Sequence, residues 1–294
     1  MKILRRKKSL KDFRSLLSPS KKIAFVPTMG YLHKGHLSLV QKAKSQSDCV
    51  IVSIFVNPLQ FSPGEDLEKY PRDEKNDLKI LAQLNVDAVF IPDQKEMLLG
   101  QSQIILTHKT LSKKYCGASR PNFFDGILTI VLKLFLLVKP DIVYFGKKDY
   151  QQLFLIKEMV RALDLDISVR SASTVRDKNG LALSSRNAYL SSYEQDQAVF
   201  AYKQMTTLAL DLKNLAQKNK QVEGKKLKSM LTKARKKIDD HRSFRLAYLV
   251  CLARETLQET KSFRYGKCVL LLAVYFFCQD KQKKEVRLID NIEI

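Results

Sequence analysis

The chain has 294 residues, of which 45% are hydrophobic and 28% are charged, values typical of a globular protein with one large or two moderate domains. Lysine and arginine number 52 against 30 aspartates and glutamates, so the formal net charge of +22 indicates anionic substrates or partners. The longest apolar runs, residues 127–138 and 268–278, are shorter than the ~20 residues that span a bilayer. This excludes a transmembrane helix and places both runs in the core.

The basic residues are spread along the chain rather than gathered in one arm or one helix. The chain also has no tryptophan and no aromatic stacking platform of the kind that RNA-binding proteins use. The charge therefore does not favour nucleic acid as a partner. We interpret most of it as solvated surface, with a smaller share attracting anionic substrates.

The five cysteines lie far apart and include no Cys-x-x-Cys pair; they are Cys49, Cys116, Cys251, Cys268 and Cys278. This pattern argues against a disulfide framework or a zinc site and is typical of a reducing compartment. The N-terminus is basic but lacks the apolar run of a signal peptide. We expect a cytoplasmic protein.

The first predicted strand, residues 23–26, leads into the stretch PTMGYLHKGH, residues 27–36, which opens a predicted helix. A strand, a glycine-containing turn and a helix N-terminus form a phosphate site, because backbone N–H groups and the positive end of the helix dipole face one point. His33 and His36 are two of the four histidines of the chain and flank Gly35, which has no Cβ between the backbone and a nucleotide. We therefore expect both imidazoles to face one pocket and to stabilise charge when an α-phosphate is attacked.

Strands and helices alternate through the first 175 residues. Further strands are predicted at 49–56, 88–91, 103–107, 141–145 and 167–170, and helices at 10–17, 72–84, 124–138 and from 147 onward. This alternation predicts an α/β fold, a doubly wound parallel, Rossmann-like sheet over residues 1–175.

Polar side chains follow three of the predicted strands. They are His33 and His36 after the first, Asn57 and Gln60 after the second, and Lys148, Asp149 and Gln152 after a later one. Ligands bind beyond the carboxyl ends of the strands in open parallel sheets. The sequence therefore predicts one ligand site at this edge of the sheet.

The pattern changes after Arg176. A hairpin-type turn at 177–180 precedes Ser184, Ser185 and Arg186, whose two hydroxyls and guanidinium can clamp phosphates. Helices are then predicted at 193–219 and 224–239, and strands at 245–251, 267–278 and 286–289. We expect residues 176–294 to form a smaller α+β domain that acts as a lid on the site.

Seven segments carry a resemblance to a known family. They are PTMGYLHKGH, SIFVNPLQF, YPRDEKND, GASRP, GKKDYQQL, TVRDKNGLALSSRNAYL and RLIDN, in that order. In their order and spacing the chain resembles the pantothenate synthetases, or pantoate–β-alanine ligases, of the His-x-Gly-His nucleotidyltransferase superfamily. The resemblance implies an AMP-forming ligase. Pantoate first attacks the α-phosphate of ATP to give pantoyl adenylate and pyrophosphate, and β-alanine then displaces AMP to give pantothenate.

The resemblance also implies roles for individual residues. Catalytic roles fall on His33, His36 and Lys148. The ATP site falls on Met29, His33, His36, Gly146, Lys148, Asp149, Ser184, Ser185 and Arg186. Pantoate is expected at Gln60 and Gln152, and β-alanine near Asn57. Mg²⁺ is expected on the leaving phosphates with no protein side chain assigned as its ligand, and family members are usually cytoplasmic homodimers.

Four positions depart from the family pattern. Cys116 and Lys147 stand where glutamate is usual, Phe123 where histidine is usual, and Ala247 where aspartate is common. The residues assigned to ATP and pantoate are retained, so we expect adenylation to be retained. The second step has lost candidate acidic partners for the ammonium group of β-alanine.

Two other interpretations stay open at this stage. One is a related nucleotidyltransferase with a different acceptor, against which the retention of Asn57, Gln60 and Gln152 argues. The other is an RNA-binding relative of the class I tRNA synthetases, which would account for the net charge.

Overall fold

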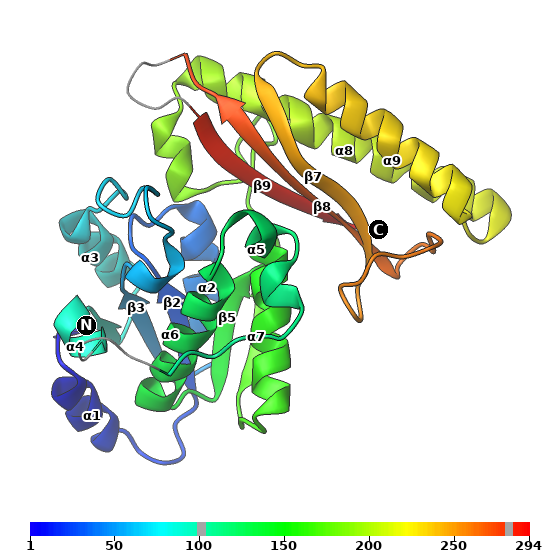
Figure 1. Ribbon diagram of the computed structural model, residues 1–294. Helices are drawn as coiled ribbons and strands as arrows, with labels where there is room; N and C mark the ends of the chain where they lie inside the picture. The colour runs from blue at the N-terminus through cyan, green and yellow to red at the C-terminus, as the bar shows by residue number, and fades with distance from the viewer. Residues whose placement is uncertain (99–103, 280–284) are drawn as a thin grey trace. The chain divides into compact units, whose positions relative to one another are not determined.

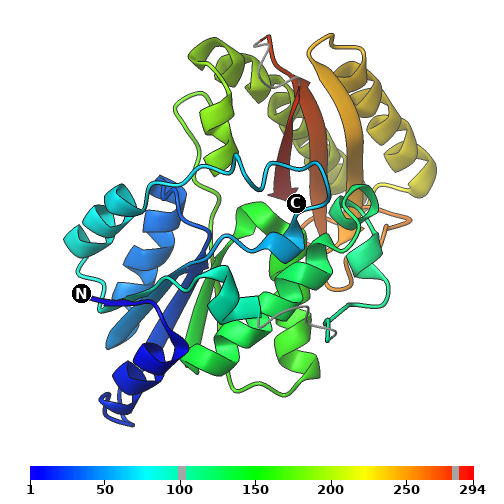
Figure 2. The same cartoon turned by 60° about the vertical axis from the view of Figure 1, so that its left-hand side comes forward.

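A computed structural model describes residues 1–98, 104–279 and 285–294 of the chain (Figures 1 and 2). The chain divides into two units. The first comprises residues 1–147 and 151–175, and the second comprises residues 148–150 and 176–294. The three-residue segment Lys148–Tyr150 thus belongs to the second unit, although both of its flanking segments belong to the first.

The first unit contains a six-stranded, wholly parallel sheet. Its strands are β1 (Lys2–Leu4), β2 (Ile23–Thr28), β3 (Cys49–Ile54), β4 (Ala88–Phe90), β5 (Ile142–Gly146) and β6 (Ser168–Ala172). Their spatial order is β1-β4-β3-β2-β5-β6, so the chain grows outward from β2 in one direction and then from β5 in the other. The prediction of a doubly wound, Rossmann-like sheet is confirmed.

Helices cover both faces of this sheet (Figure 1). They are α1 (Lys7–Ser15), α2 (Lys34–Lys44), α3 (Glu74–Gln83), α4 (Gln94–Leu98), α5 (Cys116–Ser119), α6 (Phe123–Val138) and α7 (Tyr150–Ala162). On β2, Ala24 and Val26 belong to the core cluster formed with α2 and α3. Between them Phe25 meets Phe135 of α6, with ring centroids 6.5 Å apart. Successive side chains of β2 are therefore buried on opposite faces, which explains its continuous apolar sequence.

Two elements differ from the prediction. Strand β1 was not expected, because only three residues beside a basic cluster form it; they pair with β4 through Lys2–Ala88, Ile3–Val89 and Leu4–Phe90. Conversely, the strand expected at 103–107 is absent from residues 104–107, and Gln103 lies outside the described residues. The Leu106 N–H is instead bound by the side chain of Thr129 on α6, 2.9 Å away.

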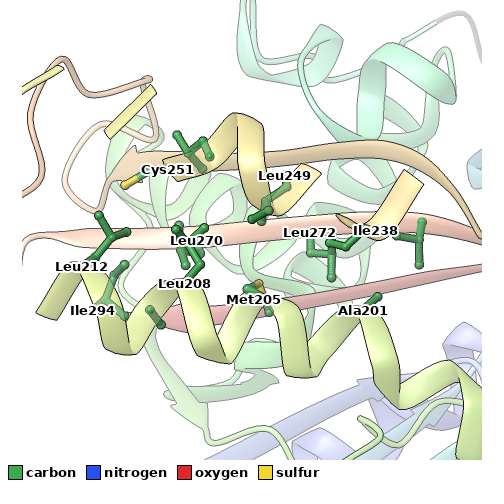
Figure 3. Packing of buried hydrophobic residues seen from close by; sticks show 14 of the residues in the cluster. Ala201, Met205, Leu208, Leu212, Ile238, Leu249, Cys251, Leu270, Leu272 and Ile294 are labelled. Carbon is green, nitrogen blue, oxygen red and sulfur yellow. The ribbon is translucent and has the colours of Figure 1, made fainter. Parts of the chain in front are cut away.

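The second unit is an antiparallel sheet covered on one face by two helices. The strands β7 (Phe244–Ala253), β8 (Cys268–Phe277) and β9 (Glu285–Glu293) pair in that order, and α8 (Ser192–Asn219) and α9 (Gly224–Asp239) precede them. Figure 3 shows Met205 and Leu208 of α8 and Ile238 of α9 packed against Leu249 and Leu272 of the sheet. The predicted smaller α+β fold is thereby confirmed. No helix of the described residues is long and apolar enough to cross a membrane.

Candidate active site

The sequence around the two histidines lies at the point where the strand order of the sheet reverses. Residues 29–33 leave the carboxyl end of β2, and Gly146 is the last residue of β5, the neighbouring strand on which the second half of the sheet begins. Such a reversal leaves a crevice outside the strand ends, which is where open α/β sheets bind ligands.

His33 and His36 are held side by side at the N-terminus of α2. His33 is the N-cap residue, and its Nδ1 accepts a hydrogen bond from the Gly35 N–H at 3.1 Å. The Nδ1 of His36 accepts from the His33 N–H at 3.4 Å, and the ring centroids are 4.1 Å apart at an interplanar angle of 33°. The turn therefore holds the two imidazoles together, and their facing a phosphate pocket remains a prediction.

These two hydrogen bonds also determine which ring nitrogen can donate. A neutral imidazole carries one N–H, so a ring whose Nδ1 accepts carries its proton on Nε2. Both rings therefore present an Nε2–H donor, and both are half-buried beside the N-terminus of α2. Two donors and the positive end of a helix dipole are suited to an anion such as a triphosphate.

Because Gly35 has no side chain, the His33 ring can pack directly against its Cα. A Cβ built on Gly35 would lie 2.9 Å from both Cε1 and Nδ1 of His33. Carbon atoms do not approach so closely, so a side chain at residue 35 requires the His33 ring to move. The glycine between the histidines is thus needed for the position of the imidazole.

Replacing Gly35 with alanine is expected to lower kcat/KM for ATP by about tenfold or more, because the displaced His33 ring no longer reaches the phosphates in the same geometry. Alanine is favoured over glycine in helices by about 1 kcal/mol, so the melting temperature should fall little. Steady-state kinetics and a thermal melt on the same preparation check this. Unchanged kinetics would show that His33 does not depend on Gly35.

The turn that carries the histidines is anchored by Asp77, which the sequence analysis did not single out. Asp77 lies on α3 and is 1% exposed; its two carboxylate oxygens accept from the Tyr31 N–H at 2.8 Å and the Leu32 N–H at 2.7 Å. Tyr31 has a left-handed backbone, φ 52°, and Gly30 before it has φ 83°. Burial raises the pKa of the Asp77 carboxyl, and the two backbone hydrogen bonds oppose that rise. Asp77 thus fixes the backbone immediately before His33.

A cavity of about 220 Å³ lies at the carboxyl ends of β2, β3 and β4, behind this turn. Its lining includes Met29 and four acidic residues, Asp73, Glu74, Asp77 and Asp93. A triphosphate would be repelled by so many carboxylates. We therefore place no nucleotide in this cavity.

Asn57 and Gln60 form a chain of hydrogen bonds that ends on Met29. Asn57 is 2% exposed, and its Nδ2 donates to the Gly126 carbonyl at 3.0 Å and to Gln60 Oε1 at 3.1 Å. The Nε2 of Gln60 lies 3.1 Å from the Met29 Sδ. The structure therefore brings these three predicted residues together. Both amide hydrogens of Asn57 are used within the protein, so its side chain orients Gln60, and a contact with β-alanine remains a prediction.

Arg120 supports the same segment and was also missed. Its guanidinium is 7% exposed, donates to both oxygens of Glu65 at 2.8 and 2.5 Å, and donates to the Gln60 carbonyl at 3.1 Å. Its Cζ lies 3.6 Å from the ring centroid of Phe123. Arg120 therefore fixes the backbone of Gln60, and Phe123 packs on Arg120 as one wall of that arrangement.

The neighbouring amides Gln151 and Gln152 have different surroundings. Gln151 is 4% exposed; it accepts from the Cys116 N–H at 3.1 Å and donates to the carbonyls of Leu111 and Lys114, both at 2.9 Å. Gln152, the residue predicted to bind pantoate, is half-buried, and its side chain has no hydrogen bond within the described part of the chain. Gln151 thus holds the loop before α5, and Gln152 has an amide available to a ligand.

The remaining predicted residues belong to the second unit. Lys148 Nζ lies 3.8 Å from Asp149 Oδ1. Ser184 is the N-cap of a short 3₁₀ helix over Ser185–Tyr189, and its hydroxyl accepts from the Arg186 N–H at 3.3 Å. This cap orders the backbone of the Ser-Ser-Arg segment.

Comparisons with known proteins place the chain in a family. The family model for pantoate–β-alanine ligase matches residues 2–293. A pantothenate synthetase of Thermosipho melanesiensis is 43% identical over 281 residues, which cover 96% of this chain and 94% of that protein. The chain belongs to the pantoate–β-alanine ligase family.

Solved structures of pantoate–β-alanine ligases share the fold. The pantothenate synthetase of Thermus thermophilus superposes with a TM-score of 0.87 at 37% identity, covering 100% of this chain and 99% of that one. The pantoate–β-alanine ligase of Francisella tularensis, solved with β-γ ATP and β-alanine, gives a TM-score of 0.78 at 35% identity, with 100% and 97% covered. The resemblance inferred from the seven segments is confirmed.

The four positions that depart from the pantoate–β-alanine ligase pattern have different surroundings. Cys116 is buried, its N–H bound by Gln151, and Phe123 packs on Arg120. Lys147 is half-buried, and Ala247 is exposed at the irregularity in the pairing of β7 with β8. Two of the four substitutions are thus accommodated in packed surroundings.

Proposed function

We propose that this chain condenses pantoate with β-alanine at the expense of ATP, through pantoyl adenylate. Membership of the pantoate–β-alanine ligase family supports the reaction. The observation that supports the mechanism is the paired arrangement of His33 and His36 at the N-terminus of α2, where both Nδ1 atoms accept from backbone N–H groups and both ring protons are therefore on Nε2.

In the first step a carboxylate oxygen of pantoate attacks the α-phosphorus of ATP. The new P–O bond forms as the bond between the α-phosphorus and the oxygen bridging to the β-phosphate breaks, and pyrophosphate leaves with the electron pair. Charge grows on the phosphate oxygens in this transition state, so donors already held in place stabilise it without reorganisation. We assign this stabilisation to His33, His36 and Lys148.

In the second step the amine of β-alanine attacks the acyl carbon of the adenylate. The bond between that carbon and the phosphate oxygen breaks, AMP leaves, and the nitrogen loses a proton to give the amide of pantothenate. The reaction needs no covalent link to the protein, so catalysis depends on positioning and charge stabilisation.

The binding roles of the remaining residues belong to the same proposal. We propose that Gln60 and Gln152 hold pantoate, with Met29 packed on Gln60 and Asn57 orienting it toward the β-alanine side. The triphosphate and ribose are assigned to backbone and side-chain groups of Gly146, Lys148, Asp149, Ser184, Ser185 and Arg186.

Mg²⁺ is part of this proposal. The described residues include no group of three or more His, Cys, Asp or Glu side chains arranged to hold a metal ion. Mg²⁺ is commonly held through substrate phosphates and water with few protein carboxylates, and the proposal assigns it no protein ligand. When bound, the ion would offset the charge of the leaving pyrophosphate.

We further propose a cytoplasmic homodimer. The five cysteines are all free thiols, which agrees with a reducing compartment.

The reaction is tested by mixing the protein with Mg-ATP, pantoate and, separately, β-alanine. Pyrophosphate should be released only when pantoate is present, and AMP and pantothenate should accumulate only when β-alanine is added. Pyrophosphate release that does not require pantoate would contradict the proposed acceptor. Adenylation without pantothenate formation would limit the proposal to its first step.

Replacing Gln152 with alanine should raise KM for pantoate by about 10-fold or more. The reason is that the carboxylate or a hydroxyl of bound pantoate would lose the amide N–H that donates to it. KM for ATP should change little. Gln151→Ala is the matched control, since Gln151 holds the loop at Leu111–Cys116 and should lower stability instead. If Gln152→Ala leaves KM for pantoate unchanged, Gln152 does not bind this substrate.

A further inference from the structure

The segment RLIDN near the C-terminus carries no role in the reaction described above, yet the structure connects it to the ATP-binding lysine. The segment lies in β9, and Asp290 and Asn291 in it are 8% and 7% exposed. Polar side chains buried to this degree are held by hydrogen bonds to specific partners. Their partners show what the strand positions.

Asn291 holds the backbone of Lys148. Its Nδ2 donates to the Lys148 carbonyl at 2.9 Å. A hydrogen bond to the carbonyl restrains the peptide group of Lys148 and hence the origin of its side chain, which has four rotatable bonds of its own. The segment Lys148–Tyr150 belongs, like Asn291, to the second unit.

Tyr150, the last residue of the segment Lys148–Tyr150, contacts Glu293, which lies two residues after Asn291 on β9. The Tyr150 hydroxyl lies 3.4 Å from Glu293 Oε1, which also accepts from Arg254 Nη2 at 2.9 Å. Burial raises the pKa of the Tyr150 hydroxyl, and a hydrogen bond with Arg254 opposes the rise. β9 therefore contacts both the first and the last residue of Lys148–Tyr150.

Asp290 links β9 to the second phosphate-binding segment. Its carboxylate accepts from both terminal nitrogens of Arg176, at 2.6 and 2.8 Å, and from the Asn291 N–H at 2.8 Å. Arg176 also donates to the Gly180 carbonyl at 3.1 Å, and its Cζ lies 3.7 Å from the Tyr202 ring centroid. Arg176 begins the loop that leads to Ser184–Arg186, so adjacent residues of one strand contact Lys148 and the start of that loop.

We propose that Asn291 is a positioning residue for ATP binding, which acts by holding the Lys148 carbonyl so that the lysine and the Ser184–Arg186 loop form one prearranged set on the second unit. This proposal rests on the proposed function for the role of Lys148. It gives the RLIDN segment a task in the reaction, and it predicts that the effect of a change at Asn291 on ATP binding depends on Lys148.

The test uses two substitutions that keep the side-chain size. Asn291→Asp replaces the donating NH₂ with an acceptor oxygen facing the carbonyl, and Asn291→Leu removes the polar group. Both should lower kcat/KM for ATP by about 10- to 100-fold, as a displaced catalytic group does, with KM for pantoate unchanged. Arg235→Met is the matched control, since it removes a donor to the Leu249 carbonyl, 2.8 Å away in the same unit. It should leave the kinetics for ATP as in the wild type.

A double-mutant cycle separates positioning from a general structural role. In a Lys148→Ala background, Asn291→Asp should cause little further loss, because the group that it positions is already absent. If the fold-losses in kcat/KM for ATP of the two single substitutions multiply in the double variant, the proposal is overturned. A wild-type kcat/KM for ATP in Asn291→Asp would also overturn it.

The dissociation constant of ATP, measured by calorimetry on the full chain, distinguishes this proposal from the proposed function. Asn291→Asp should raise that constant by about tenfold, whether or not pantoate is the acceptor. If the wild type binds ATP but shows no pantoate-dependent reaction, the ligase proposal fails while the positioning role is decided by this constant. An unchanged constant in Asn291→Asp overturns the positioning role even if the ligase reaction is found. Should Asn291→Leu not fold, Asn291→Asp alone decides the question.

Discussion

Replacing His36 with alanine should lower the rate of pantoate-dependent pyrophosphate release by about 100- to 1,000-fold, the usual effect of removing one preorganised donor from a transition state. The Nδ1 of His36 accepts from the His33 N–H, so the ring proton of neutral His36 is on Nε2. KM for ATP should rise much less than kcat falls, because the donor matters most when charge develops on the α-phosphate. Single-turnover measurement of pyrophosphate release gives the chemical step directly.

Two further substitutions separate the chemistry of His36 from its role in the turn. His36→Asn keeps an acceptor near the position of Nδ1 but lacks the distal donor, so it should fold normally and remain inactive. His36→Gln places an amide N–H near the position of Nε2 and should recover part of the rate. His108→Ala is the matched control: the Nδ1 of His108 also accepts a backbone N–H, that of Leu111 at 3.1 Å. Near-wild-type release by His36→Asn would remove His36 from the mechanism.

Replacing Asp77 with alanine should destabilise the protein by about 2–6 kcal/mol, because two backbone N–H groups, one buried and one partly buried, lose their acceptor at about 1–3 kcal/mol each. Those groups belong to Tyr31 and Leu32, directly before His33. The left-handed backbone at Gly30 and Tyr31 would lose its anchor, so the imidazoles would no longer be held in position. We therefore expect kcat also to fall by about 100-fold, well beyond what the unfolded fraction explains.

The control for Asp77 is at the opposite edge of the sheet. The carboxylate of Asp141 accepts from the Ile23 N–H at 2.6 Å at the amino end of β2. Asp141→Ala should lower the unfolding free energy but leave kcat per folded molecule unchanged. Chemical denaturation gives the unfolding free energy of each variant, and kcat is measured at a temperature where each variant is folded. Together they distinguish a loss of stability from a loss of catalysis. If Asp77→Ala loses stability while its kcat stays at the wild-type value, Asp77 only supports the fold.

The strands of the first unit and the histidine turn could be predicted because their signals are local. Continuous apolar runs such as Cys49–Ile54 indicate a strand buried on both faces, and a glycine between two histidines at a helix N-terminus indicates a phosphate site. The short β1 carries no such signal, since its position is decided by pairing with β4, over eighty residues later in the chain.

The supporting residues of the site could not be found in this way. Asp77 lies 46 residues from Tyr31, and Arg120 lies 60 residues from Gln60, so only the folded chain brings them together. Both residues fall in segments that match the family, YPRDEKND and GASRP. A match does not distinguish a residue that binds substrate from one that holds other residues of the site in place. Gln151 and Gln152 show the same limit, because they are adjacent residues of the same type on one helix. Only the folded structure shows that the Gln151 side chain is buried and hydrogen-bonded within the protein.

The central claim, that pantoate is activated as a mixed anhydride with AMP, is tested most directly with pantoate labelled with ¹⁸O in its carboxylate. Attack on the α-phosphorus followed by cleavage at the acyl carbon transfers one carboxylate oxygen to the phosphate. AMP formed in the presence of Mg-ATP and β-alanine should therefore carry one ¹⁸O, and pyrophosphate should carry none. Pantothenate formed with unlabelled AMP, or with the label in pyrophosphate or inorganic phosphate, would contradict the adenylate.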